Sequence, residues 1–217
     1  HLCGMIAGKV WPQPLKEGAD LMTFSTYKSL GGPAGGLIVT NNKEIAKKLD
    51  AIAYPGLTAN FDAAKTAALA ITLQDWKSVG KNYAQKMASC AKELANELDH
   101  KGLKLFAKNK GFTQSHQFAV IANEFGGGQT AAKRLRKANI LACGIGLPGE
   151  TVENDVNGLR IGTPELVRIG MKEKDMKQIA DFIYRALTTN DLNQIAKEVT
   201  EFRANFKGVH YTIDLPE

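Results

Sequence analysis

The sequence predicts an α/β fold, in which short apolar strands alternate with amphipathic helices. Short apolar runs occur at residues 21–24, 37–39 and 117–122 and around Arg160, each bounded by glycine, proline or polar residues, which is typical of buried strands. Longer stretches such as 62–99 repeat apolar residues at helical spacing. The 217 residues are enough for one large domain or two small ones.

Composition excludes several classes of protein. The three cysteines, Cys3, Cys90 and Cys143, are odd in number and far apart, which excludes a disulfide framework and fits a reducing cytoplasm. No apolar run approaches membrane-spanning length and no signal-peptide pattern is present. The net charge is +6, but the lysines are spread along helical segments, which favours solvated helix faces over a nucleic-acid surface. We therefore expect a cytoplasmic protein with no membrane partner, no nucleic-acid partner and no metal site.

Residues 20–41 are the most informative stretch. An apolar run at 21–24 is followed by polar residues, by Lys28, by a glycine-rich segment around Pro33 and by a second apolar run at 37–39. The pattern predicts a strand, a lysine turn, a glycine loop and a strand. A lysine here is either a loop lysine that reaches solvent or one whose neutral amine serves carbonyl chemistry. The polar residues before the lysine are Ser25, Thr26 and Tyr27.

The order of residues from Ala19 to Gly36 resembles the serine hydroxymethyltransferase family around its cofactor lysine. That family has Ala-Asp, a Thr-rich strand, His-Lys and a Gly-Pro-x-Gly-Gly loop, and its members are pyridoxal-phosphate enzymes of the aspartate-aminotransferase fold (fold type I). The resemblance implies that Lys28 forms an internal aldimine with pyridoxal 5′-phosphate. It also implies a catalytic role for Tyr27, which stands where the family has histidine, and a cofactor contact for Ser25.

The first eight residues carry a second match. His1-Leu-Cys-Gly-Met-Ile-Ala-Gly8 resembles the family's Asp-x-x-His-x-x-Gly segment, in which the histidine contacts the phenolic oxygen of the cofactor. The resemblance implies that His1 binds the cofactor, and that the aspartate pairing with the pyridine nitrogen would lie three residues before His1. We therefore expect this chain to be the C-terminal half of a longer protein. We also expect it to be inactive alone, because the protonated ring is the electron sink.

Residues 42–52 predict a helix capped by Asn42 and ended by Tyr54-Pro55-Gly56. The family has Phe-Pro-Gly there, followed by a Gln-Gly-Gly-Pro loop that receives the cofactor phosphate of the neighbouring subunit. This chain has Leu-Thr-Ala-Asn-Phe at 57–61 instead, in which Thr58 and Asn60 could still donate hydrogen bonds. The resemblance implies a homodimer or tetramer.

The pattern from Asp62 to Asp99 predicts a long helix with a possible break at Gly80. In fold-type-I enzymes a long helix here joins the large and small domains. The resemblance therefore implies a C-terminal part of the large cofactor-binding domain at 1–75, a connecting helix at 76–100 and a small α/β domain at 101–217.

The remaining pattern alternates strands and helices. His116 precedes a strand and is interpreted as a structural histidine. The glycine-rich segment 143–149 is interpreted as a loop. The expected strands are 103–106, 117–122 and 139–141, and the expected helices are 129–138, 176–187 and 192–206.

Arg160 carries the last match. Gly158-Leu-Arg-Ile-Gly-Thr-Pro164 resembles the family's Gly-Ile-Arg-x-Gly-Thr-Pro, whose arginine clamps the carboxylate of the amino-acid substrate. A guanidinium in an apolar strand needs a partner, and its planar fork suits a carboxylate. A structural ion pair is the alternative. Thr163 is expected to cap a following helix that starts at Pro164.

The resemblance implies a serine/glycine hydroxymethyltransferase of one-carbon metabolism, which reversibly cleaves the Cα–Cβ bond of a β-hydroxy amino acid through an aldimine on Lys28. Tetrahydrofolate would then be a second cofactor. However, Gly31 and Ala34 stand where the family has arginines, and Ile145 aligns with a folate-contacting asparagine. The open alternatives are a folate-independent aldolase or transaldolase, an aminotransferase or decarboxylase of the same fold, a non-catalytic dimerisation module and a basic RNA-binding protein.

Overall fold

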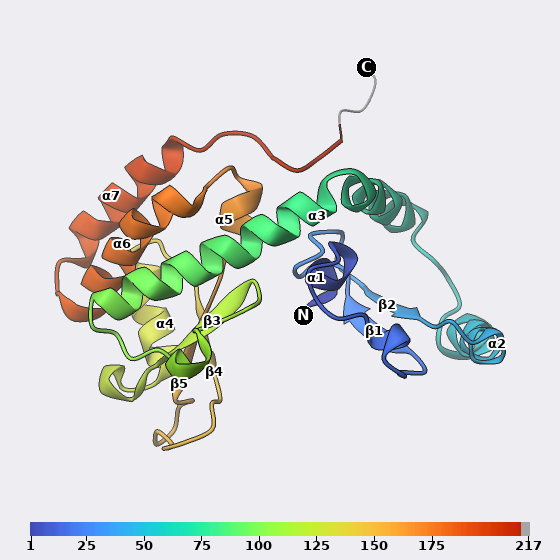
Figure 1. Ribbon diagram of the computed structural model, residues 1–217, viewed down its shortest axis with the longest axis horizontal. Helices are drawn as coiled ribbons and strands as arrows, with labels where there is room; N and C mark the ends of the chain where they lie inside the picture. The colour runs from blue at the N-terminus through green and yellow to red at the C-terminus, as the bar shows by residue number, and fades with distance from the viewer. Residues whose placement is uncertain (214–217) are drawn as a thin grey trace. The chain divides into compact units, whose positions relative to one another are not determined.

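The computed structural model describes residues 1–213, which form two compact units (Figure 1). One unit is His1–Gln85 together with the segment that starts at Tyr211, and the other is Lys86–His210. Both contain helices and strands, which confirms the α/β prediction. Among the described residues, no helix has both the length and the apolar character needed to cross a membrane.

A β-hairpin is the centre of the first unit. Strands β1 (Met22–Ser25) and β2 (Gly36–Val39) pair antiparallel, with Met22 opposite Val39 and Ser25 opposite Gly36. This confirms the predicted strand, turn, loop and strand. Helix α1 (Cys3–Ala7) and the 3-10 turn η1 (Pro14–Lys16) precede the hairpin.

Helix α2 (Lys43–Ala51) follows the hairpin, and Asn42 caps it as predicted. The Asn42 side-chain oxygen accepts hydrogen bonds from the amides of Glu44 at 2.9 Å and Ile45 at 3.2 Å, which satisfies two of the open donors of the first turn. Segment η2 (Ile52–Leu57) contains the non-helical residue Tyr54, so the helix ends where expected.

Helix α3 (Ala63–His100) is continuous over 38 residues and contributes to both units. The predicted break at Gly80 is wrong. A Cβ atom at Gly80 would lie 2.5 Å from Cε3 of Trp76, one turn earlier. Gly80 is therefore explained by space for the Trp76 ring, and not by a break in the helix.

The second unit is built on a three-stranded antiparallel sheet of β3 (Gln117–Ile121), β4 (Cys143–Ile145) and β5 (Gly158–Gly162), in the order β3-β5-β4. Helix α4 (Gly128–Lys137) packs on β4 and β5, and α6 (Met176–Thr188) packs on α4 and α7 (Leu192–Ala204). The fully buried core of this unit includes Leu94, Leu98, Val120, Leu135, Leu159 and Ile183. The remaining elements are α5 (Pro164–Arg168), η3 (Lys108–Lys110), η4 (Asn123–Phe125) and η5 (Glu173–Asp175).

Three local predictions in this unit are wrong. The segment 103–106 is not a strand and makes only one isolated bridge, from Leu105 to Val120. The strand expected at 139–141 begins instead at Cys143, because Asn139 takes a left-handed φ of 60° that no strand accommodates. Residues 143–145 of the expected glycine loop are therefore strand β4.

Candidate functional site

Lys28 lies in the turn that closes the β1–β2 hairpin. The amide of Thr26 donates a hydrogen bond to Gly35 O at 3.0 Å, and the Thr26 hydroxyl donates one to Pro33 O at 2.5 Å. The amide of Gly31 donates to Lys28 O at 2.8 Å, and Gly31 has a φ of 67°, which glycine tolerates best. The backbone around the lysine is thus fixed by its own hydrogen bonds.

The side chains before and after this turn differ in exposure. Thr26 is buried, whereas Tyr27 is 54% exposed and Lys28 is half-buried. The Lys28 Nζ atom lies 5.9 Å from the centroid of the Tyr27 ring. Ser25 is half-buried at the end of β1. A primary amine, a phenol and a hydroxyl are therefore grouped on four consecutive residues.

The segment that starts at His1 is tied to this turn by Ser29. The buried Ser29 hydroxyl donates to His1 O at 2.5 Å and accepts from the amide of Gly4 at 3.0 Å. The thiol of Cys3 donates to Ser25 O at 3.3 Å. A Cβ atom at Gly4 would lie 2.3 Å from Ser29 O, so the approach requires glycine. Sequence reasoning missed Ser29, for which the only available signal was a hydroxyl next to the lysine.

These residues fit one end of a pyridoxal-phosphate site. The amine of Lys28 can condense with an aldehyde, and the Ser25 hydroxyl and Tyr27 phenol can exchange hydrogen bonds with a polar ring. Small residues keep the loop close to the strand, since a Cβ atom at Gly32 would lie 3.1 Å from Thr26 O. The chemistry of this donor set matches the cofactor that the sequence implies.

Arg160 lies in the second unit, on the central strand β5. Its cross-strand partners are the small residues Ala119 and Cys143, and its side chain is half-buried. Arg160 lines a hollow of about 270 Å³. A guanidinium beside apolar walls suits a carboxylate that carries an apolar part. The other side chains of the hollow include Phe106, Phe112, Ser115 and Ile145.

His116 lies next to the start of β3 and is 3% exposed. Burial lowers its pKa to about 4, and the positive charge of Arg160 acts in the same direction. His116 is therefore neutral at neutral pH. Its carbonyl oxygen accepts from the amide of Thr163 at 3.0 Å, which joins the start of β3 to the end of β5.

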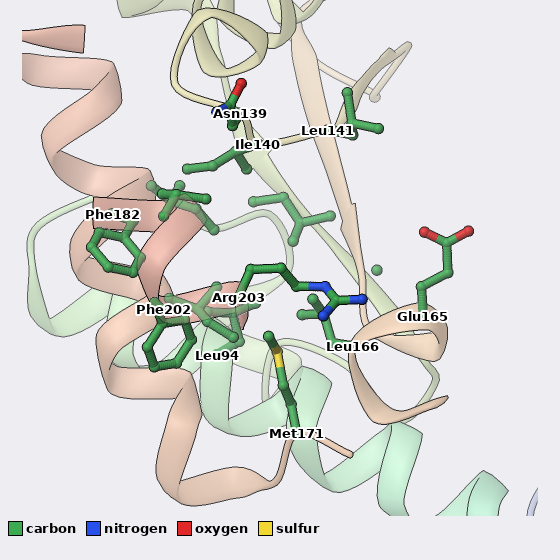
Figure 2. Close-up of a pocket in the computed structure, with 15 residues that line it drawn as sticks. Leu94, Asn139, Ile140, Leu141, Glu165, Leu166, Met171, Phe182, Phe202 and Arg203 are labelled. Carbon is green, nitrogen blue, oxygen red and sulfur yellow. The ribbon is translucent and has the colours of Figure 1, made fainter. Parts of the chain in front are cut away.

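The residue after Arg160 lines a different cavity. Successive strand residues point to opposite faces, and Ile161 borders a cavity of about 210 Å³ that is lined mainly by apolar side chains (Figure 2). Arg203 lies across it, and its Nη1 donates to Phe206 O at 2.6 Å near the end of α7. The apolar labelled side chains include Leu94, Met171 and Phe182, which offer packing rather than chemistry.

The predicted site residues thus fall in two groups. His1, Ser25, Tyr27 and Lys28 lie together in the first unit, and Arg160 lies in the second unit. Their roles toward cofactor and substrate stay predictions.

Comparison with known proteins identifies the family. The model of the serine hydroxymethyltransferase family matches residues 1–183, which is most of the chain. The chain is 56% identical over 212 residues to an alpha-methylserine aldolase from a Ralstonia species, covering 97% of this chain and 48% of that protein. It is 42% identical over 217 residues to a serine hydroxymethyltransferase from Saccharolobus islandicus, covering 99% of this chain and 50% of that protein.

A solved structure agrees with these relatives. The crystal structure of L-threonine transaldolase from Pseudomonas fluorescens, in its internal aldimine state, superimposes with a TM-score of 0.89 at 29% identity. The match covers 99% of this chain and 49% of that one, and the chain spans about half the length of the curated relatives it matches. The fold is therefore that part of a fold-type-I pyridoxal-phosphate enzyme, and the chain belongs to the serine hydroxymethyltransferase family.

Proposed function

We propose that the whole protein reversibly cleaves the Cα–Cβ bond of a β-hydroxy amino acid, with Lys28 as the covalent anchor of pyridoxal 5′-phosphate. The observation that carries this proposal is the Lys28 turn. Lys28 is half-buried and lies between the buried residues Thr26 and Ser29, both of which are hydrogen-bonded. Such a turn holds an amine at a defined place while leaving it accessible.

Each of the other residues has a role in this proposal. Bound pyridoxal phosphate would supply an electron-withdrawing ring next to the α-carbon of the substrate. Ser25 and His1 would contact the cofactor, and the Tyr27 phenol would hold or transfer a proton beside Lys28 Nζ. Arg160 would bind the α-carboxylate through its two parallel N–H groups and so orient the bond that breaks.

A folate-independent aldolase reaction is the form of this chemistry that we favour. The chain is 56–57% identical to alpha-methylserine aldolases and 39–42% identical to serine hydroxymethyltransferases, with similar coverage of both. For α-methylserine, the Cα–Cβ bond breaks as the β-hydroxyl loses its proton. The β-carbon leaves as formaldehyde, and a proton added to the α-carbon yields alanine. We therefore propose that tetrahydrofolate is not required.

The anchor is tested by reducing the full-length protein with borohydride and mapping its peptides. A pyridoxyl group on Lys28 is expected, and Lys28→Ala should lose both this adduct and the visible absorbance of the bound cofactor. A pyridoxyl group on another lysine contradicts the proposal.

The reaction is tested by measuring the amino-acid product, alanine from α-methylserine and glycine from serine, each with and without tetrahydrofolate. We expect alanine formation from α-methylserine to be unchanged by folate. Glycine formed from serine only when folate is present, with no alanine formed from α-methylserine, would assign the protein to the hydroxymethyltransferase reaction instead.

We further propose that the whole protein is cytoplasmic and forms a homodimer or tetramer, because the family places cofactor contacts on the neighbouring subunit. The 217-residue chain by itself is expected not to turn over, since it spans about half the length of its relatives. Turnover by the purified chain starting at His1 would disprove this, and light scattering of the full-length protein tests the oligomer.

A further inference from the structure

We propose that Trp76, on helix α3, is a positioning residue that holds the Lys28 turn in place through a hydrogen bond to the turn backbone. This inference rests on the proposed role of Lys28. The indole Nε1 of Trp76 donates a 2.7 Å hydrogen bond to Leu30 O, two residues after the lysine. Trp76 is 7% exposed and Leu30 is 2% exposed, so water does not readily replace this bond.

Glycines on two sides of the Trp76 indole leave room for the ring. A Cβ atom at Gly80 would lie 2.5 Å from Cε3 of Trp76, and a Cβ atom at Gly4 would lie 2.9 Å from its Cη2. Contacts that short are not tolerated against a rigid ring. A glycine within a long helix destabilises the helix. The space that the Trp76 ring needs explains why residue 80 is nevertheless a glycine.

A pair of stacked tyrosine rings packs next to the Trp76 ring. Tyr83 lies with its ring centroid 5.4 Å from that of Trp76, and Tyr211 stacks on Tyr83 at 4.9 Å. The amide of Ile213 donates to the Asp75 carboxylate at 2.9 Å, next to Trp76 in sequence. A segment close to the C-terminus therefore packs against the part of α3 that holds the lysine turn.

Three hydrogen bonds thus hold the two residues that follow Lys28, and two of the three are buried. Ser29 is bonded to the segment from His1 to Gly4, and Leu30 is bonded to Trp76 of α3. The Thr26–Gly35 bond holds the residues before it. Loss of the indole N–H leaves a buried carbonyl unsatisfied and frees one side of the turn. The lysine then samples more orientations, and its amine is no longer held at one place.

Two variants of the full-length protein test this. Trp76→Phe keeps an aromatic ring but removes the N–H donor. Gly80→Ala keeps the tryptophan but pushes its ring aside, although alanine is the better helix former. Lys77→Ala is the matched control, because Lys77 is the exposed neighbour of Trp76 on α3.

The first measurement is the rate of acetic anhydride labelling of Lys28 in the cofactor-free protein, relative to the exposed Lys81 in the same digest. We expect both test variants to raise this ratio by about fivefold to tenfold, the factor that one lost hydrogen bond implies. The second is the rate at which the holoenzyme releases pyridoxal phosphate, which should rise by a similar factor. Lys77→Ala should change neither rate.

The inference is overturned if both variants label Lys28 and release the cofactor at the wild-type rates. If the melting temperature falls while both rates stay unchanged, Trp76 has a structural role only. Failure of the proposed function is seen separately, because it appears as a wild-type protein without a pyridoxyl group on Lys28. The labelling of the cofactor-free protein does not depend on that result.

Discussion

Thr163 Oγ1 donates a 2.7 Å hydrogen bond to Met87 O, and both residues are fully buried. The same hydroxyl lies 3.2 Å from His116 O. The prediction that Thr163 caps α5 is therefore only half right: the helix does begin at Pro164, but the Thr163 side chain makes no cap hydrogen bond. Thr163 instead joins the end of β5 to helix α3 and to the start of β3.

Thr163→Val is accordingly expected to destabilise the protein. Valine has nearly the same shape but removes the hydroxyl donor to the buried Met87 carbonyl oxygen, whereas His116 O keeps its hydrogen bond from the amide of residue 163. We expect this loss to cost about 1–3 kcal/mol in the free energy of unfolding. Urea unfolding followed by circular dichroism measures the change. Thr188→Val is the control, because Thr188 is exposed near the end of α6 and its hydroxyl bonds only within the helix. Equal losses for both variants would refute the role of Thr163.

Buried His116 should make stability depend on pH. Its pKa is about 4 in the folded protein and about 6.5 in the unfolded chain. Between these values the unfolded chain binds a proton that the folded protein does not, so the free energy of unfolding falls as pH drops from 6.5 to 4. The slope cannot exceed about 1.4 kcal/mol per pH unit. His116→Gln should flatten this part of the stability profile, whereas His100→Gln, at an exposed position, should not.

Asp155 is expected to make stability depend on pH in a more acidic range than His116 does. Its carboxylate accepts from the amides of Gln129 and Thr130 and from the Thr130 hydroxyl at 2.8–3.0 Å, at the start of helix α4. The hydrogen bond from the Gln129 amide, with those from Thr130, lowers the pKa of Asp155 to about 2. The stability this provides is complete above pH 3.8, the ordinary value, and is lost as pH falls toward 2.

Asp155→Asn should therefore lower stability at neutral pH and remove the pH dependence between 3.8 and 2. Thermal melts at a series of pH values measure both effects. Asp50→Asn is a control at an exposed position of α2. An unchanged acid profile in Asp155→Asn would show that the hydrogen bonds from Gln129 and Thr130 to Asp155 do not contribute to the pH dependence.

Local patterns were enough to predict much of the fold. The β1–β2 hairpin, the Asn42 cap of α2 and helix α6 follow from apolar periodicity and cap chemistry, which act within a few residues. The errors have a different origin. Asn139 takes a left-handed conformation that apolar neighbours do not signal, and Gly80 serves a ring one turn earlier and not a break.

The candidate site shows the same division. Lys28 and Arg160 were predicted because motifs of neighbouring residues identify them. Ser29 and Trp76 were missed as partners, because their bonds reach Gly4 and Leu30, which lie 25 and 46 residues away in the chain. Contacts at such separations leave no periodic pattern in a single sequence, so only the folded structure reveals them.

Arg160→Lys in the full-length protein is the test of substrate binding. Lysine keeps the positive charge but loses the planar fork that binds a carboxylate with two parallel hydrogen bonds. We expect the binding of glycine or serine to weaken by about 2–3 kcal/mol, the scale of a charge-assisted hydrogen bond. Spectral titration of the bound cofactor measures this affinity, and the cofactor itself should remain on Lys28.

The alternative for Arg160 is a structural ion pair within the second unit, and the two roles separate cleanly in this experiment. A structural arginine would lower the melting temperature when changed and leave the folded enzyme with its normal affinity for amino acids. Arg136→Lys, at an exposed position of α4, is the matched control for the chemical change. If Arg160→Lys and wild type give the same titration midpoint with glycine and serine, Arg160 does not bind the carboxylate. Arg160 is then assigned to the structural ion pair.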